Sequence, residues 1–469
     1  MTTIPKTQLP RRIKFFYGLG DWGTAASTTA RNVFWFFFLT SVVGLDAAIA
    51  GTIFLVGRLW DGINDPIVGM LSDRVQTRWG RRRPFLLFGA IPFGLSFALM
   101  FTVPPFTERW AIVLYYVAVF LAFDSLYTLI NVPYSALTPE LSDDYDERSN
   151  LAGWRIGVSI LASLLTGGLF KVVAENVFAP RFGGVDGLQS GYALAALLWG
   201  VTMIIPYFIL FKVIREPERE IVKDPIRPIQ TFKEVFGNRP FRLASLIYLL
   251  TFATVDVVLL IFVRFLIDYI RVTPGFDNVL LAVVLGLAFV TMPLTVRMMR
   301  RFGKRHTYIG SMAFLSVMLL IMSQVPPGGQ NLILIAAVFA GLGYGAANAI
   351  PWAIVADVIE VDELQTGKRR EGVFYGYLVF FRKLASALAT FAVGHVLSAT
   401  GFISSQAGSA YVQQPESALL AMRFFVGVVP AVMLFLAILA AWRYPLDRDT
   451  YNDIRRQLDE RREQAESSP

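Results

Sequence analysis

Two carboxylates stand inside an apolar segment in the stretch Ile53-Phe-Leu-Val-Gly-Arg58-Leu-Trp60-Asp61-Gly-Ile-Asn64-Asp65-Pro66-Ile67. A charged side chain at bilayer depth costs about 3 kcal/mol or more unless it is neutralised, so such residues indicate a functional site. Asp61 and Asp65 are four residues apart and would share one face of a helix. Two carboxylates that close need a cation, a proton or an arginine beside them. The stretch therefore predicts a cation site inside a membrane-spanning helix.

The whole chain has the composition of a polytopic membrane protein. Of its 469 residues, 55% are hydrophobic and only 17% are charged, whereas soluble proteins carry about 25% charged residues. Apolar segments recur near the length of roughly 20 residues that crosses a bilayer. We expect an all-α fold of twelve transmembrane helices in two six-helix bundles. The predicted spans are 14–43, 47–72, 84–104, 110–139, 152–174, 190–213, 241–270, 278–300, 306–325, 331–358, 372–399 and 417–443.

Basic residues gather in alternate loops, after the second, eighth and tenth predicted spans. Because positively charged loops stay in the cytoplasm, we expect both termini to be cytoplasmic in a multi-pass protein of the plasma (inner) membrane. A polar stretch divides the spans six and six. The predicted domains are residues 1–213, an N-terminal bundle; 214–240, a cytoplasmic linker; 241–443, a C-terminal bundle; and 444–469, a cytoplasmic tail.

An internal repeat supports this division. Arg78-Trp-Gly80-Arg81-Arg82 follows the second span, and Arg301-Phe-Gly303-Lys304-Arg305 follows the eighth. Val132-Pro133-Tyr134-Ser135 in the fourth span has a counterpart in Ile350-Pro351-Trp352-Ala353 of the tenth. Paired bundles with a site near the bilayer midplane are typical of secondary transporters.

Several classes of function are not indicated. The chain has no cysteine and two histidines, which excludes disulfides and thiolate metal sites. It carries no zinc-ligand motif, nucleophile elbow or phosphate loop, so we expect neither an enzyme nor a cofactor. The net charge of +8 resides in short loops and does not indicate nucleic acid. The expected partners are a small solute, a coupling cation and the bilayer, and we expect a functional monomer.

The candidate cation ligands lie on two predicted spans. Asn64 and the hydroxyl of Thr128 would complete, with Asp61 and Asp65, the oxygen ligands that hard cations prefer. The alternative is a structural salt bridge between Asp61 and Arg58, which would leave Asp65 in need of another partner.

Other charged residues within the spans suit a solute or one another. Arg155 and Lys383 would hold anionic or hydroxyl groups of a solute, or neutralise the aspartates when no cation is bound. A buried arginine is expensive, so Arg31 is expected to meet Asp124, Asp21 or an anionic ligand. In the seventh span an ion-paired stripe is expected from Asp256, Arg264 and Asp268.

Three segments resemble the glycoside–pentoside–hexuronide:cation symporters, the melibiose permease group of the major facilitator superfamily. They are Arg58-Leu-Trp60-Asp61-Gly-Ile-Asn64-Asp65-Pro66, residues 131–148 (beginning Asn131-Val-Pro133-Tyr), and residues 356–372 with Asp357, Arg369 and Glu371. The loop with Asp73-Arg74 and Gly80-Arg81-Arg82 resembles the loop motif of the superfamily. The resemblance covers essentially the whole predicted core.

The resemblance implies roles for particular residues. Sodium would bind at Asp61, Asn64, Asp65 and Thr128. With the residues named above, the solute site would comprise Arg31, Asp124, Asn131, Arg155 and Lys383, and the gating or structural residues would be Arg58, Asp73, Arg74, Asp357, Arg369 and Glu371. The family's other galactoside-binding positions fall on Ala25, Ser135, Leu378 and Val379, so we do not expect melibiose as the substrate.

These observations predict a symporter coupled to sodium or protons that moves a small solute, a glycoside, uronide or related polar molecule, by alternating access. Two alternatives stay open. One is a transporter of an anionic or lysolipid-like amphipathic solute. The other is a non-transporting membrane receptor on the same fold.

Overall fold

The computed structural model describes residues 9–75, 77–141, 145–215, 236–366, 371–404, 412–446 and, between 450 and 460, all but 452, 455 and 459. Throughout these residues the elements are helices, with no β-strand. The chain forms two compact units. The first comprises Met1–Val222 with Gly394–Pro415, and the second comprises Lys223–Val393 with Glu416–Pro469.

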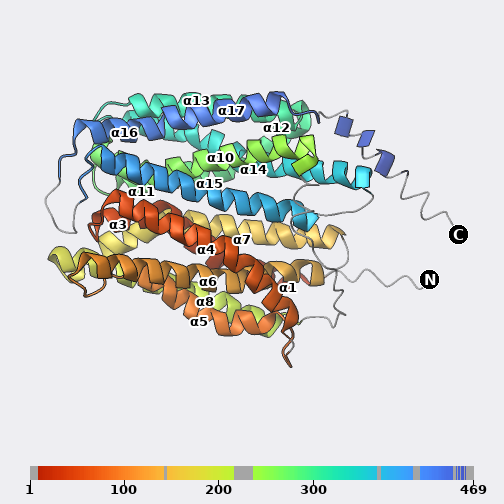
Figure 1. The fold of residues 1–469 in the computed structure, drawn as a ribbon, viewed down its shortest axis with the longest axis horizontal. Coiled ribbons are helices and arrows are strands. Elements are labelled where there is room, and N and C mark those ends of the chain that lie inside the picture. The colour runs from red at the N-terminus through yellow and green to blue at the C-terminus, as the bar shows by residue number, and fades with distance from the viewer. Residues whose placement is uncertain are drawn as a thin grey trace. The chain divides into compact units, whose positions relative to one another are not determined.

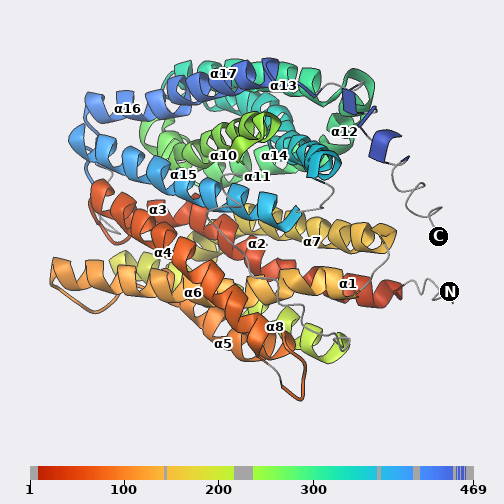
Figure 2. The ribbon, with the colours of Figure 1, turned by 45° about the vertical axis from the view of Figure 1, so that its right-hand side comes forward.

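The first unit contains the first six predicted spans, which Figure 1 draws from red to yellow-green. Helix α5 packs on α6 and α8, α4 packs on α6, and α2 packs on α7. Figure 2 shows α2 beside α7. The elements are α1 (Arg11–Leu19), α2 (Asp21–Ala30), the π-helix η1 (Arg31–Trp35) and α3 (Phe36–Ser41) in the first span, then α4 (Ala47–Arg74), α5 (Arg83–Met100), α6 (Arg109–Leu141), α7 (Tyr145–Val172) with η2 (Val173–Phe178) and η3 (Ala179–Arg181), and α8 (Gly184–Val213).

The second unit contains the other six predicted spans, except the last residues of the eleventh, from Gly394 onward, which are grouped with the first unit. Helix α14 packs on α10, α11 and α13, while α17 packs on α10 and α13. The described residues between 450 and 460 are helical, with Ile454 and Leu458 buried. The elements are α10 (Arg239–Arg264) with the π-helix η4 (Phe265–Ile270), α11 (Phe276–Val290), α12 (Met292–Phe302), α13 (Lys304–Gln324), α14 (Gln330–Thr366), α15 (Glu371–Ala399), α16 (Glu416–Val426) and α17 (Val428–Trp442).

The membrane spans agree with the sequence prediction, and the exceptions are informative. Among the described helices, nine are long and apolar enough to cross a membrane, or ten if the bent pair α11 and α12 is one span. The two remaining predicted spans are the first, which is divided into short helices, and α4. Helix α4 carries Arg58, Asp61 and Asp65, and these charges lower its hydropathy. Polar character is therefore concentrated where the sequence predicts the cation site.

Small residues bring particular helices close together. A Cβ built on Gly57 of α4 would lie 2.1 Å from the Phe120 ring on α6. A Cβ built on Gly94 of α5 would lie 2.6 Å from the carbonyl oxygen of Gly200 on α8. Glycine lets helix backbones approach closely, which drives helix association in membranes. The Gly57 contact lets α4 pack closely against the helix that carries Asp124 and Thr128.

A turn with the same design occurs in both units. Gly80 (φ 105°) and Gly303 (φ 80°) both have the left-handed backbone that favours glycine. After each glycine an arginine donates a hydrogen bond to a carbonyl near the end of the last helix of its own unit. Arg83 donates to Phe211 O of α8, and Arg305 donates to Trp442 O of α17. A guanidinium there satisfies an orphan carbonyl and favours the negative end of the helix dipole.

The first helix of each unit also has a common plan. An aromatic residue precedes an aspartate by four positions, as Tyr17 and Asp21 in the first unit and Phe252 and Asp256 in the second, 235 positions further on. A π-helical turn follows in each case, η1 and η4 respectively. Single π turns are frequent at functional sites. The repeat seen in the loops thus extends into the helices that carry buried charges.

Candidate functional site

Helices α4 and α6 carry the four residues predicted to bind a cation. The Thr128 hydroxyl donates a 2.8 Å hydrogen bond to Asp65 Oδ1, and Asn64 Nδ2 lies 3.4 Å from the carbonyl oxygen of Asp124. Asp61, Asn64 and Thr128 are buried, and Asp65 is half-buried. The set of two carboxylates, an amide and a hydroxyl supplies the oxygen ligands that suit a small hard cation.

Arg58 forms the salt bridge that the sequence left open as an alternative. Its Nη1 lies 3.3 Å from Asp61 Oδ2, and the two side chains are 8% and 2% exposed. The other terminal nitrogen reaches Asn32 Oδ1 at 3.5 Å. Strong charge-assisted N–H···O bonds measure about 2.7–2.9 Å. The Arg58–Asp61 bond is longer, which suits a carboxylate that can exchange its guanidinium for a cation.

Arg31 pairs with Asp124, one of the partners expected for it. The Nη1–Oδ1 distance is 2.7 Å, and the side chains are 4% and 1% exposed. Arg58 and Asp61 also act electrostatically on Arg31, which joins the two ion pairs into one group. These two residues, predicted as solute ligands, thus bind each other at the edge of the cation ligands.

Five charged side chains of the first unit form one group. We call it the cation cluster, and it consists of Arg31, Arg58, Asp61, Asp65 and Asp124. Two guanidinium groups and three carboxylates therefore share this part of the first unit, and a bound cation or proton would interact directly with the carboxylates.

Arg155 has a partner that the sequence reasoning did not single out as a site residue. Its Nε lies 2.7 Å from Asp21 Oδ2, and its Nη2 lies 3.2 Å from Asp21 Oδ1, a bidentate ion pair. It also donates to Thr138 Oγ1 at 3.1 Å and stacks over the Tyr134 ring at 4.5 Å. The signal in the sequence was a lone aspartate in the first span. Arg155 therefore pairs with α2 and not with the aspartates of α4.

The remaining predicted solute ligands lie on separate helices. Asn131 is half-buried on α6, one turn beyond Thr128, and Lys383 is half-buried on α15 of the second unit. In the seventh span, the expected stripe is partly wrong. Arg264 pairs with Asp268 at 3.2 Å, whereas Asp256 interacts electrostatically with Arg382.

One predicted gating residue, Asp357 of α14, has a clear partner at the start of α13. Asp357 accepts a 2.5 Å hydrogen bond from Lys304, which also reaches Ala353 O at 3.0 Å. Beside them, burial raises the pKa of Tyr444 well above its usual range, and the charge of Asp357 adds to this effect. Tyr444 stays protonated and donates to Ile354 O at 3.2 Å. Arg369 and the side chains of Asp73, Arg74 and Glu371 lie outside the described residues.

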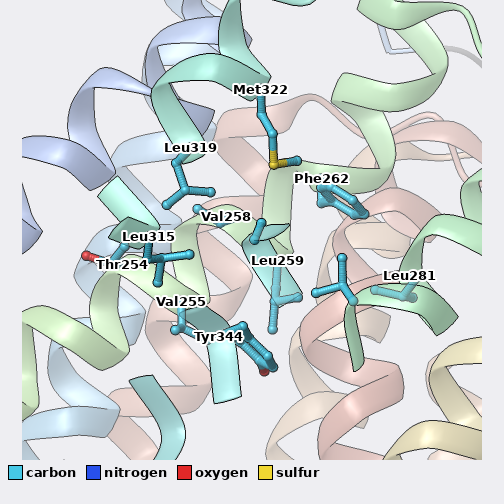
Figure 3. A pocket seen from close by; sticks show the side chains of 12 residues that line it. Thr254, Val255, Val258, Leu259, Phe262, Leu281, Leu315, Leu319, Met322 and Tyr344 are labelled. Atoms are coloured by element: carbon cyan, nitrogen blue, oxygen red, sulfur yellow. The ribbon is translucent and has the colours of Figure 1, made fainter. Parts of the chain in front are cut away.

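An apolar cavity in the second unit is distinct from these charged groups (Figure 3). Its lining includes Val258, Leu259, Phe262, Leu319 and Met322. Its volume is about 40 Å³. Its lining carries no charged side chain that could recognise a charged group of a solute.

Comparison with known proteins gives the family. The pattern of the family described as MFS/sugar transport protein matches residues 16–448. A symporter of Synechocystis sp. described as uncharacterized is 32% identical, over 96% of this chain and 97% of that protein. A glucuronide carrier protein homolog of Escherichia coli is 29% identical, over 97% of each chain. The sodium-dependent lysophosphatidylcholine symporter 1-A of Danio rerio is 28% identical, over 99% of this chain and 93% of that protein.

The solved structures agree on the fold. The crystal structure of a D-xylose-proton symporter matches with a TM-score of 0.66 and 14% identity, over 93% of this chain and 97% of that one. This likeness confirms the predicted twelve-helix fold, and the family confirms a membrane transporter and not an enzyme. With the family pattern running from the first span to the twelfth, the chain belongs to the MFS/sugar transport protein family of multi-pass membrane transporters.

Proposed function

We propose that the chain is a symporter that couples the movement of one monovalent cation to that of a small polar solute. The observation that carries the proposal is the set of oxygen ligands that Asp61, Asn64, Asp65 and Thr128 present on α4 and α6. Sodium is the leading ion because Asp61, Asn64, Asp65 and Thr128 offer several oxygens. A proton is the second candidate, since a coupled carboxylate pair binds either.

Coupling would follow from competition for Asp61. When the cluster is empty, Arg58 is the positive charge beside that carboxylate. A cation bound to Asp61 and Asp65 would replace part of this attraction and release Arg58. If the released state binds the solute better, the cation and the solute stabilise each other's binding.

The solute is proposed to be a glycoside, a uronide or a related polar molecule. Support comes from the relatives, which include a glucuronide carrier protein homolog. Arg155, Asn131 and Lys383 are the proposed contacts. An anionic or lysolipid-like solute is the second candidate, favoured by the basic residues and by the lysophosphatidylcholine symporter among the relatives. We further propose a plasma-membrane monomer with both termini in the cytoplasm.

The test uses purified protein in sealed liposomes. A labelled solute should accumulate when a sodium or proton gradient is imposed, and an ionophore that collapses the gradient should abolish accumulation. Asp61→Asn and Asp65→Asn should each abolish gradient-driven uptake. Asp268→Asn is the matched control, because it removes a buried, arginine-paired carboxylate elsewhere. Solute binding without accumulation under any gradient would favour a receptor and refute the proposal.

A further inference from the structure

Arg382 lies in the second unit in surroundings that differ from those of any other buried arginine described above. Its guanidinium stacks 4.0 Å above the Phe252 ring, and Tyr248 acts on it electrostatically. Phe252 and Tyr248 are 2% and 0% exposed, whereas Arg382 is half-buried. The guanidinium thus rests on a buried aromatic floor, while the residue as a whole keeps some exposure.

The aromatic floor is rigid. The Tyr248 ring lies 4.6 Å from Phe252 and 4.9 Å from Trp352. Trp352 follows Pro351 of α14, just as Tyr134 follows Pro133 of α6 beside Arg155. Rings packed edge to face hold the guanidinium in one orientation without using its N–H groups in strong ion pairs.

A comparison of the two units identifies what Arg382 lacks. Asp21 and Asp256 hold equivalent positions, as do Tyr17 and Phe252, and Arg155 and Arg382 both approach these aromatic residues. In the first unit the arginine and aspartate form a bidentate pair at 2.7 and 3.2 Å. Asp256 acts on Arg382 only at longer range, and among the described residues Arg382 has no carboxylate oxygen within 4.0 Å.

We propose that Arg382 binds an anionic group of the transported solute, a carboxylate, sulfonate or phosphate, in the place that Asp21 occupies beside Arg155. The planar guanidinium matches such groups with two parallel hydrogen bonds. The Tyr248 hydroxyl and the Trp352 ring flank the bound group. Asp256 competes with the solute for the same charge, so the site discriminates against solutes that carry no negative charge. This assignment deepens the proposed function and rests on it for the identity of the ligand as a solute.

Lys383, the next residue, does not duplicate this role. Successive residues of an α-helix point about 100° apart, so Arg382 and Lys383 face different directions from α15. A lysine is also a point charge and cannot form the bidentate contact. The two residues can therefore be tested separately.

The experiment measures binding to the purified, full-length protein without any ion gradient. The members of three matched pairs of probes differ mainly in one anionic group: methyl glucuronide with methyl glucoside, dihydroxypropanesulfonate with glycerol, and glycerol phosphate with glycerol. We expect at least one anion to bind and to raise the melting temperature, and its neutral partner to do neither. Arg382→Gln should weaken the binding of that anion at least tenfold. Arg382→Lys should also weaken it, but by a smaller factor, because the charge is kept while the bidentate contact is lost.

Asp256→Asn gives a result of opposite sign. Removing the competing carboxylate should tighten anion binding several-fold, which a merely structural role for the pair would not produce. Arg264→Gln, which removes a buried arginine of the same unit, should leave the affinity within twofold. The inference is overturned if the folded wild-type protein binds no anion of the panel, if neutral partners bind equally, or if Arg382→Gln leaves the affinity unchanged.

The outcomes separate this inference from the proposed function. If anion binding depends on Arg382 but no gradient drives uptake, symport fails and the Arg382 site stands. If a gradient drives uptake of an anion whose binding ignores Arg382, the site fails and symport stands.

Discussion

Replacing Arg58 by glutamine should raise the affinity of the cation cluster for sodium. Arg58 Nη1 lies 3.3 Å from Asp61 Oδ2, and a hard cation sits about 2.4 Å from a carboxylate oxygen. A cation on the other side of that carboxylate would therefore be roughly 6 Å from the guanidinium charge. At an effective dielectric constant of about 20, two unit charges at that separation repel by about 3 kcal/mol.

Removing this repulsion should tighten sodium binding by roughly 30- to 100-fold, since every 1.4 kcal/mol is about a factor of ten. The assay is titration calorimetry of purified protein in sodium-free choline buffer. The variant should also become more dependent on sodium for thermal stability, because Asp61 loses its resident partner.

The matched control is Arg264→Gln. It breaks a buried arginine–aspartate pair of similar geometry, 3.2 Å and about 5% exposed, on another helix. Sodium affinity should not change in that variant. An unchanged or weaker affinity in Arg58→Gln would refute the competition between Arg58 and the cation, and Arg58 would then be a structural ion-pair partner only.

Three further outcomes follow from the contacts. Thr128→Val removes the hydroxyl that donates to Asp65 at 2.8 Å, so it should weaken sodium binding about tenfold, which is about 1.4 kcal/mol. Thr128→Ser keeps a hydroxyl and should bind sodium with nearly wild-type affinity. An unchanged sodium affinity in the valine variant would contradict the role of Thr128 as a ligand. Asp21→Asn leaves Arg155 without its bidentate partner and should lower the free energy of unfolding by about 3 kcal/mol, as measured from the unfolding midpoint. Asp21→Glu should lower it less. An unaltered midpoint in the asparagine variant would mean that the ion pair contributes little to stability. Gly57→Ala forces a Cβ against the Phe120 ring and should lower the free energy of unfolding by about 1–3 kcal/mol. Gly310 is a helical position with open space around it, so Gly310→Ala should raise the free energy of unfolding by up to about 1 kcal/mol. Similar melting temperatures for the two variants would show that α4 and α6 can move apart.

The spans were predictable because each is an apolar run of membrane-crossing length. Most of the predicted ranges match helices or pairs of helices within a few residues. The first span is divided into four short elements, α7 and α8 begin six or seven residues earlier than predicted, and α14 continues to Thr366. The grouping of Asp61, Asn64 and Asp65 was also predictable, because helical spacing alone puts them close together.

The partners of the arginines were not predictable in the same way. Arg155 and Asp21 are 134 positions apart, and nothing local distinguishes Asp21 from the other acidic residues of the spans. In the seventh span, spacing favoured pairs within one helix. That reasoning holds for Arg264 and Asp268 but fails for Asp256, because α15 brings Arg382 near it. The π turns were missed because Arg31-Asn-Val-Phe-Trp35 contains neither proline nor glycine.

The π turn at Arg31–Trp35 has a consequence for the tolerance of the chain to insertions and deletions. Such a turn accommodates one surplus residue, so α2 and α3 are rotated by about 100° relative to an uninterrupted helix of the same sequence. Deleting one residue within the turn would restore regular winding and preserve the faces that both ends present. Deleting one residue within α2 would instead rotate Asp21 out of reach of Arg155. The number of residues between Asp21 and the π turn is therefore constrained, whatever the types of those residues.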